Sequence, residues 1–201
     1  GHMLMAADYA QIELRIIAHM SGDPGLVQAF AEEKDIHTAT AATVFSVDYD
    51  DVTRAQRDRV KQVNYGIPYG ISAFGLANRL RIGRSEAQEL IDQYQAAYPR
   101  VIAFLGELAD EARQRGYVET LLGRRRYVPQ ITSRNPNDRA YAERIAVNMP
   151  IQGTQADMIK IAMIAIHAGL ADVSAGARMI LQVHDELVFE VPEGDVEAVS
   201  E

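Results

Sequence analysis

The sequence contains no cysteine and no tryptophan, and aromatic residues make up only 7% of its 201 positions. Without cysteine the chain cannot form disulfides, use a thiolate nucleophile or hold zinc or iron–sulfur centres through sulfur. No apolar run approaches the roughly 18–20 residues that a membrane-spanning helix needs, so we expect no membrane partner and predict a cytoplasmic location. The composition, 48% hydrophobic and 24% charged, is sufficient for one large domain or two small ones with a buried core.

Lysine is also scarce, since only three of the 20 basic residues are Lys. The formal net charge of −8 argues weakly against a general nucleic-acid binder. The basic residues are nevertheless unevenly distributed, and residues 113–144 hold eight Arg against three acids. Because the planar guanidinium donates two hydrogen bonds to one phosphate, this stretch suits a phosphate-bearing partner. A solvated arginine-rich surface without a partner explains the charge pattern equally well.

Turn signals and hydrophobic spacing predict an α+β fold. Gly1-His2-Met3 is typical of the remnant of a cleaved tag and is not used to predict the fold, and the acidic end suggests a piece of a longer protein. The strand at 3–7 and the hairpin at 177–191 are far apart in sequence but free to pair in space. Between them, a second hairpin is expected around Gly123, and helices are expected from Ile12 to Met20 and over 35–45, 53–65, 72–82, 85–98, 100–115, 139–148 and 154–169.

Two acidic positions carry the first chemical signal. Asp8 ends the first strand, and Asp185-Glu186 lies at the tip of the last hairpin. If these strands are neighbours, their carboxylates converge at one sheet edge, and a divalent cation would relieve their repulsion. Oxygen ligands favour Mg²⁺ or Mn²⁺, and two such ions can clamp a phosphoryl transfer. Taken alone, each acid is equally typical of a turn or a helix cap.

A helical segment carries the second signal. Arg57, Lys61 and Tyr65 recur every four residues and therefore share one helix face. Two cations followed by an aromatic ring suit a nucleotide, with the cations on the phosphates and the ring near the sugar or base. By itself, this pattern also fits a solvated basic face whose aromatic residue dips into the core.

Taken together, the motifs resemble those of the family A DNA polymerases, the bacterial DNA polymerase I group. The matching segments are Asp-Tyr-Ala-Gln-Ile-Glu-Leu-Arg at 8–15, Asp-Ile-His at 35–37, Arg57 through Gly70, Arg144 through Thr154, and Val-His-Asp-Glu at 183–186. The resemblance implies an antiparallel palm sheet, formed by the first strand and the last hairpin, with a large helical fingers insertion. It places the first part of the palm at 4–24, the fingers at 25–135 and a second, truncated part of the palm at 136–201.

The same resemblance implies roles for individual residues. Asp8 and Asp185 would ligate two Mg²⁺ ions, for which Mn²⁺ can substitute, with help from the backbone of Tyr9; Glu186 and Lys61 would assist catalysis. Glu13 would act as the steric gate against a ribose 2′-OH. Nucleotide contacts would come from Gln11, Glu13, His37, Arg57, Lys61, Tyr65 and Tyr69, and DNA contacts from Arg144, Asn148, Gln152 and His184.

The implied reaction is template-directed transfer of a nucleotide from a dNTP to the 3′-OH of a primer, with primer–template DNA as the partner. Two positions depart from the common pattern: Pro68 removes a backbone donor near Tyr69, and Tyr65 replaces a frequent Phe. A non-catalytic folding fragment with little activity alone remains an alternative. A single-subunit RNA polymerase relative is another, disfavoured by Glu13, and a metal-dependent nuclease would not need the Arg–Lys–Tyr helix. The sequence leaves the oligomeric state open.

Overall fold

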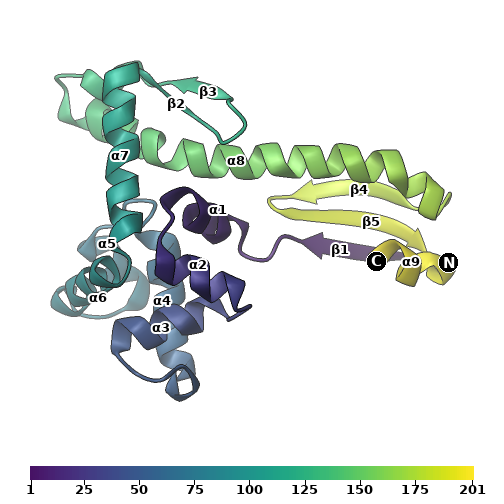
Figure 1. Ribbon diagram of the computed structural model, residues 1–201, viewed down its shortest axis with the longest axis horizontal. Helices are drawn as coiled ribbons and strands as arrows, with labels where there is room; N and C mark the ends of the chain where they lie inside the picture. Colours follow the sequence, from purple (N-terminus) through teal and green to yellow (C-terminus); the bar gives the residue numbers. More distant parts are fainter. The chain divides into compact units, whose positions relative to one another are not determined.

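The structure, a computed structural model, describes residues 1–201 and separates into two compact units (Figure 1). The first, which we call the sheet unit, comprises Gly1–Glu13 and Gln152–Glu201, and the second, the helical unit, comprises Leu14–Ile151. This mixture of helices with small antiparallel sheets agrees with the predicted α+β class. No helix is long and apolar enough to cross a lipid bilayer.

The sheet unit is built on three antiparallel strands in the order β1-β5-β4, where β1 is His2–Asp8, β4 is Arg178–Val183 and β5 is Glu186–Pro192 (Figure 1). The predicted pairing of strands from opposite ends of the chain is therefore confirmed. Burial along β5 alternates with the period of two that a strand with one covered face requires, and its buried residues are Leu187, Phe189 and Val191. After Pro192 the chain forms a short turn η3 (Glu193–Asp195) and helix α9 (Val196–Ser200).

The first strand corrects one expectation about the N-terminus. The strand was predicted to begin at Met3, but it begins one residue earlier, because the tag-like His2 already pairs with Pro192 in the β1–β5 ladder. Backbone hydrogen bonding between strands does not depend on side-chain identity, so a tag-like dipeptide extends a strand as readily as any other sequence.

The long helix α8 (Pro136–Val173, 38 residues) corrects a second expectation, because two helices were predicted here. The helix continues through Pro150, which lies inside α8. Proline removes one backbone donor, but the flanking Met149 and Ile151 are buried, and their packing outweighs that loss. Within the predicted helix 154–169, Met158 and Ile161 are exposed, whereas Ile159 is buried.

The helical unit contains seven helices before α8 and one small hairpin. Helix α2 was not predicted, because Asp23-Pro24 was interpreted as a stop signal; Asp23 instead caps α2, accepting hydrogen bonds from the backbone of Gly25 and Leu26, and Pro24 occupies its first turn. The bounds are α1 (Ile12–Ser21), α2 (Pro24–Ala31), α3 (Ile36–Phe45), η1 (Tyr49–Asp51), α4 (Arg54–Gly66), α5 (Ala73–Leu80), α6 (Arg84–Ala97), α7 (Pro99–Arg115), β2 (Tyr117–Glu119), β3 (Arg125–Tyr127) and η2 (Pro129–Thr132).

Helix α4 positions most of the predicted basic residues, and its start follows from the sequence. Thr53 and Gln56 form a reciprocal capping box, with the side chain of each bonded to the backbone of the other. Val60 and Val63 are fully buried and fix which face of the helix points inward. The helix ends at Gly66, so Pro68 lies beyond it in a turn closed by a backbone bond from Ile71 to Gly66.

Candidate functional site

Three acids from opposite ends of the chain meet at one end of the three-stranded sheet. Asp8 is the last residue of β1 and stands opposite Glu186, the first residue of β5. The backbone N–H of Tyr9 donates to the carbonyl oxygen of Asp185 at 3.4 Å, so the turn between β4 and β5 lies directly beside the end of β1. We call Asp8, Asp185 and Glu186 the acid edge. Asp8 is exposed, and the other two are partly exposed.

The backbone next to the acid edge adopts a conformation that is uncommon for residues with a side chain. His184, in the turn before Asp185, has φ 53°, and Gln11, which follows the end of β1, has φ 56°. The side-chain amide of Gln182, two residues before His184, donates a hydrogen bond to the carbonyl oxygen of His184 at 2.9 Å. Left-handed backbone in non-glycine residues costs about 1 kcal/mol or more and is enriched at functional sites.

The donor set of the acid edge fits a divalent cation shared with a substrate. No group of three or more His, Cys, Asp or Glu side chains in the chain is arranged to hold a metal by itself. Mg²⁺ in phosphoryl-transfer sites is typically held by only one or two carboxylates, and phosphate oxygens and water complete its coordination. Asp8 and Asp185, with the carbonyl of Tyr9, supply that kind of oxygen-only, incomplete donor set.

On α4, Arg57 is held by an acid from another helix. Its Nε donates to one carboxylate oxygen of Asp35 at 2.8 Å and its Nη2 donates to the other at 2.9 Å. Asp35 also caps α3 by accepting from the backbone N–H of Thr38 at 2.9 Å and from the Thr38 hydroxyl at 2.6 Å. Burial raises the pKa of Asp35, but the hydrogen bonds from Arg57 and Thr38 together outweigh it and hold the pKa well below the ordinary value.

The other predicted members of this helix face differ in exposure. Lys61 is exposed, whereas Tyr65 is partly buried and its ring lies 5.6 Å from the ring of His37, at an interplanar angle of 57°. We call the group of Arg57, Lys61, Tyr65 and the adjoining, buried His37 the basic face. Arg59, on another side of α4, instead pairs with Glu86 of α6 at 2.7 Å.

His37, which was predicted to contact phosphate, is only 3% exposed. Its Nδ1 lies 3.0 Å from the side-chain nitrogen of Asn64, which sequence reasoning missed. Burial lowers the pKa of His37; Asp35 opposes this shift, and Arg57 and Lys61 add to it. Asn64 lies four positions after Val60, on the buried face of α4, and nothing in the sequence marks it as the partner of His37.

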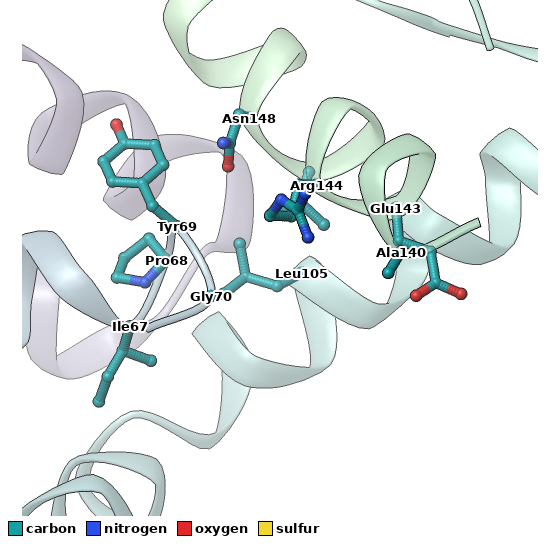
Figure 2. A pocket seen from close by; sticks show the side chains of 10 residues that line it. Ile67, Pro68, Tyr69, Gly70, Leu105, Ala140, Glu143, Arg144 and Asn148 are labelled. Carbon is teal, nitrogen blue, oxygen red and sulfur yellow. The ribbon is translucent and has the colours of Figure 1, made fainter. Parts of the chain in front are cut away.

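A cavity of about 340 Å³ lies within the helical unit, and three of the predicted site residues line it (Figure 2). Tyr69 belongs to the turn after α4, and Arg144 and Asn148 project from α8 toward that turn. The side-chain oxygen of Asn148 is buried and has no hydrogen-bond partner. The rest of the lining is Ile67, Pro68, Gly70, Leu105, Ala140, Glu143 and Val147.

The remaining predicted residues lie in the sheet unit. Glu13 is in the first turn of α1, and Gln152 is an exposed residue of α8. With Gln11 and His184, they belong to the same unit as the acid edge, whereas the basic face and the 340 Å³ cavity belong to the helical unit. The roles given to all these residues remain predictions.

Comparison with known proteins defines the class to which this fold and these motifs belong. The profile of DNA polymerase family A matches residues 1–201, and the chain belongs to that family. The particular proteins it resembles are bacterial DNA polymerases I. It is 52% identical to DNA polymerase I of Bacillus subtilis over 195 residues, covering 97% of this chain and 22% of that protein. It is 52% identical to DNA polymerase I of Pseudomonas aeruginosa over all 201 residues, again 22% of that protein.

A thermostable relative and a solved structure give the same result. DNA polymerase I of Thermus aquaticus is 48% identical over 200 residues, or 24% of its length. The POL domain of Pol1 from M. smegmatis, solved in complex with DNA primer-template and dNTP, is 48% identical with a TM-score of 0.92, covering 98% of this chain and 35% of that one. The chain thus spans about a fifth of the length of the curated relatives it matches.

Proposed function

We propose that this chain is part of the catalytic region of a template-directed DNA polymerase, contributing the metal-binding acids and a triphosphate-binding helix. In this proposal residues 4–24 and 136–201, which include the β1-β5-β4 sheet, form part of the palm, and the helices within 25–135 form the fingers. The observation that carries the proposal is the register of β1 against β5, which sets Asp8 opposite Glu186 and beside Asp185 from the other end of the chain. A solved relative in complex with DNA primer-template and dNTP supports the choice of ligands.

The acid edge would hold the divalent ions. Asp8 and Asp185, with the carbonyl of Tyr9, would bind two Mg²⁺ or Mn²⁺ ions, and Glu186 would add negative charge nearby. When bound, such ions neutralise phosphate charge and make a primer 3′-hydroxyl easier to deprotonate. The exposure of Asp8 keeps its carboxylate available to a ligand that brings further oxygen atoms.

The basic face would bind the triphosphate of a dNTP. Arg57 and Lys61 supply positive charge, His37 supplies a ring nitrogen, and Tyr65 supplies an aromatic surface for the sugar or base. Lys61 is exposed and could give a proton to the departing pyrophosphate. Positioning and charge neutralisation would supply most of the rate acceleration, as is general for phosphoryl transfer.

The remaining assignments concern selectivity and DNA. Glu13 would exclude a ribose 2′-OH with support from Gln11, and Tyr69 would lie by the templating position. DNA contacts would come from Arg144, Asn148, Gln152 and His184. The buried, unpartnered oxygen of Asn148 beside the 340 Å³ cavity supports the placement of a polar ligand there.

The proposal is tested by measuring Mn²⁺-dependent binding of a dNTP to the 201-residue chain. We expect Asp8→Asn and Asp185→Asn to abolish the metal dependence, whereas Asp172→Asn, at an exposed position of α8, leaves it unchanged. Metal-independent binding that is insensitive to both substitutions would contradict the proposal. Primer extension with Mg²⁺, using Asp185→Ala as the inactive control, then separates a catalytic piece from one that binds nucleotide without synthesis.

A further inference from the structure

A chain of buried polar side chains lies inside the helical unit and includes His37 of the basic face. It joins His37 and Thr40 on α3, Asn64 on α4 and Tyr98 at the junction of α6 and α7. The exposed fractions of these four residues are 3%, 0%, 1% and 3%. Buried polar groups of this kind are stable only where hydrogen bonds replace water, so each donor and acceptor in the chain constrains the next.

The hydrogen bonds of Asn64 assign the proton on His37. The Asn64 side-chain nitrogen lies 3.0 Å from His37 Nδ1 and donates to Thr40 Oγ1 at 3.3 Å, while its oxygen has no partner. With the amide reversed, both N–H groups of Asn64 would be buried without acceptors, and orphaned buried N–H donors are rarer than under-satisfied oxygens. Asn64 is therefore the donor, and His37 Nδ1 is the acceptor.

A neutral imidazole carries one proton, so an accepting Nδ1 leaves that proton on Nε2. The neutral form of His37 is favoured at pH 7 because burial lowers the pKa of the ring. The positive charges of Arg57 and Lys61 also disfavour a positive charge on the imidazole. Asp35 acts in the opposite direction, but it is already paired with Arg57. The Tyr65 ring, with its centroid 5.6 Å away, lies against the imidazole and limits its rotation.

We propose that Asn64 is a positioning residue that holds His37 in the Nε2–H tautomer, so that Nε2 donates a hydrogen bond to a phosphate oxygen of a bound triphosphate. This inference rests on the proposed function, because it assumes that the basic face binds the triphosphate. Asn64 touches neither substrate nor metal in this scheme and acts only through the ring of His37.

The tautomer can be measured directly in the 201-residue chain. Long-range ¹H–¹⁵N correlation spectra distinguish a protonated from an unprotonated ring nitrogen, and the His37→Phe variant assigns the signals. We expect the Nε2–H form of His37 at pH 7.5 in the unsubstituted chain. Finding the Nδ1–H form would overturn the inference, whether or not any variant folds.

The substitution Asn64→Asp tests the role of the donor with almost no change of shape. A carboxylate can only accept, so we expect it to draw the single proton of the neutral ring to Nδ1 and leave Nε2 without a proton to donate. The matched control is Asn78→Asp on α5, an exposed Asn that the same substitution changes without touching His37. A His37 tautomer unchanged by Asn64→Asp would overturn the inference.

Binding of inorganic tripolyphosphate connects the tautomer to function. We expect Asn64→Asp to weaken binding at least tenfold in the unsubstituted chain and much less in the His37→Phe background, because the cycle removes the general effect of an added negative charge. Equal losses in both backgrounds would overturn the inference alone. If the unsubstituted chain binds neither tripolyphosphate nor a dNTP, the proposed function itself fails, and the inference fails with it.

Discussion

The carboxylate of Asp35 and the guanidinium of Arg57 form a two-point ion pair between α3 and α4, with N–O distances of 2.8 and 2.9 Å. Asp35 therefore does two things at once, because the same carboxylate caps α3 and fixes the position of Arg57. An arginine held in this way has less side-chain freedom to lose when it binds a phosphate, but it must also share its charge with the carboxylate.

Separating the two roles of Asp35 gives a first prediction. Asp35→Ser retains a good N-cap residue but is too short to keep the ion pair, so we expect the free energy of unfolding to fall by about 0.5–1 kcal/mol. The matched control is Asp58→Ser, which removes the exposed partner of Arg54 and should change stability by less than about 0.5 kcal/mol. Urea denaturation measures both. Equal effects of the two substitutions would show that the Asp35–Arg57 pair contributes nothing beyond a surface contact.

The low pKa of Asp35 predicts how this contribution depends on pH. Because the pKa is lower in the folded chain than in the unfolded chain, the ion pair stabilises the fold above the ordinary pKa of 3.8, and the stabilisation is lost as the pH falls below it. The difference in unfolding free energy between the parent chain and Asp35→Ser should therefore be constant above about pH 5 and shrink below about pH 4. A difference that persists unchanged down to pH 3 would argue against an ionised Asp35 as its source.

A side chain larger than that of Gly66 should disturb the packing where α4 ends. A β-carbon at this position would lie 2.7 Å from the Cγ2 of Ile71, a branch close to the backbone that cannot move aside. We expect Gly66→Ala to destabilise the chain by about 1–3 kcal/mol. Gly106→Ala is the control, because nothing lies within 4 Å of its β-carbon on α7, and it should stabilise by about 0.5–1 kcal/mol through helix propensity. Thermal unfolding of both variants checks the prediction, which fails if the two changes have the same sign.

The elements that could be predicted from the sequence are those whose signals are local. The capping box of Thr53, the glycine after Arg115 and the turn around Gly123 each mark a boundary within a few residues of itself. Asp23-Pro24 was misjudged because the same dipeptide can end one helix and begin the next. The continuity of α8 through Pro150 was not predicted, because local propensity alone does not reveal that Met149 and Ile151 are buried.

The candidate site likewise contains residues that local motifs predict and residues that only the packing of helices reveals. Asp8 and Asp185 were predicted from motifs, and the structure sets the end of β1 beside the turn that carries Asp185, while their role as metal ligands stays a prediction. The partners of the basic face were not identified, because Asp35 meets Arg57 across 22 positions and Asn64 meets His37 across 27. Such pairs depend on how α3 packs against α4, and no periodicity within either helix reports on that packing.

Under the proposed function, Tyr65 determines how a polymerase that carries this sequence treats chain terminators. The resemblance to the family implies that a hydroxyl at this position accompanies weak rejection of 3′-deoxy chain terminators. We expect Tyr65→Phe to reduce incorporation of a dideoxynucleotide relative to the matching dNTP. Primer extension with both nucleotides in competition measures the ratio, and the same ratio for both proteins would contradict the assignment of Tyr65 to the sugar.

Tyr94 and Tyr98 form an edge-to-face pair with ring centroids 5.1 Å apart. We expect substitution of each by Phe to have different effects on stability. The hydroxyl of Tyr94 is buried without a hydrogen-bond partner, and burial raises its pKa. Its removal in Tyr94→Phe should therefore leave stability unchanged or increase it by about 1 kcal/mol. The Tyr98 hydroxyl donates to Thr40 Oγ1 at 3.0 Å, so Tyr98→Phe should destabilise by about 1 kcal/mol.

Both tyrosine variants keep the aromatic ring, so any difference between them reports on the hydroxyl groups alone. Chemical denaturation at pH 7 gives the two free energies under identical conditions. A loss of stability in Tyr94→Phe as large as that in Tyr98→Phe would mean that the Tyr94 hydroxyl has an acceptor in solution. Because Thr40 also accepts from Asn64, Tyr98→Phe should in addition shift the ring signals of His37, whereas Tyr94→Phe should not.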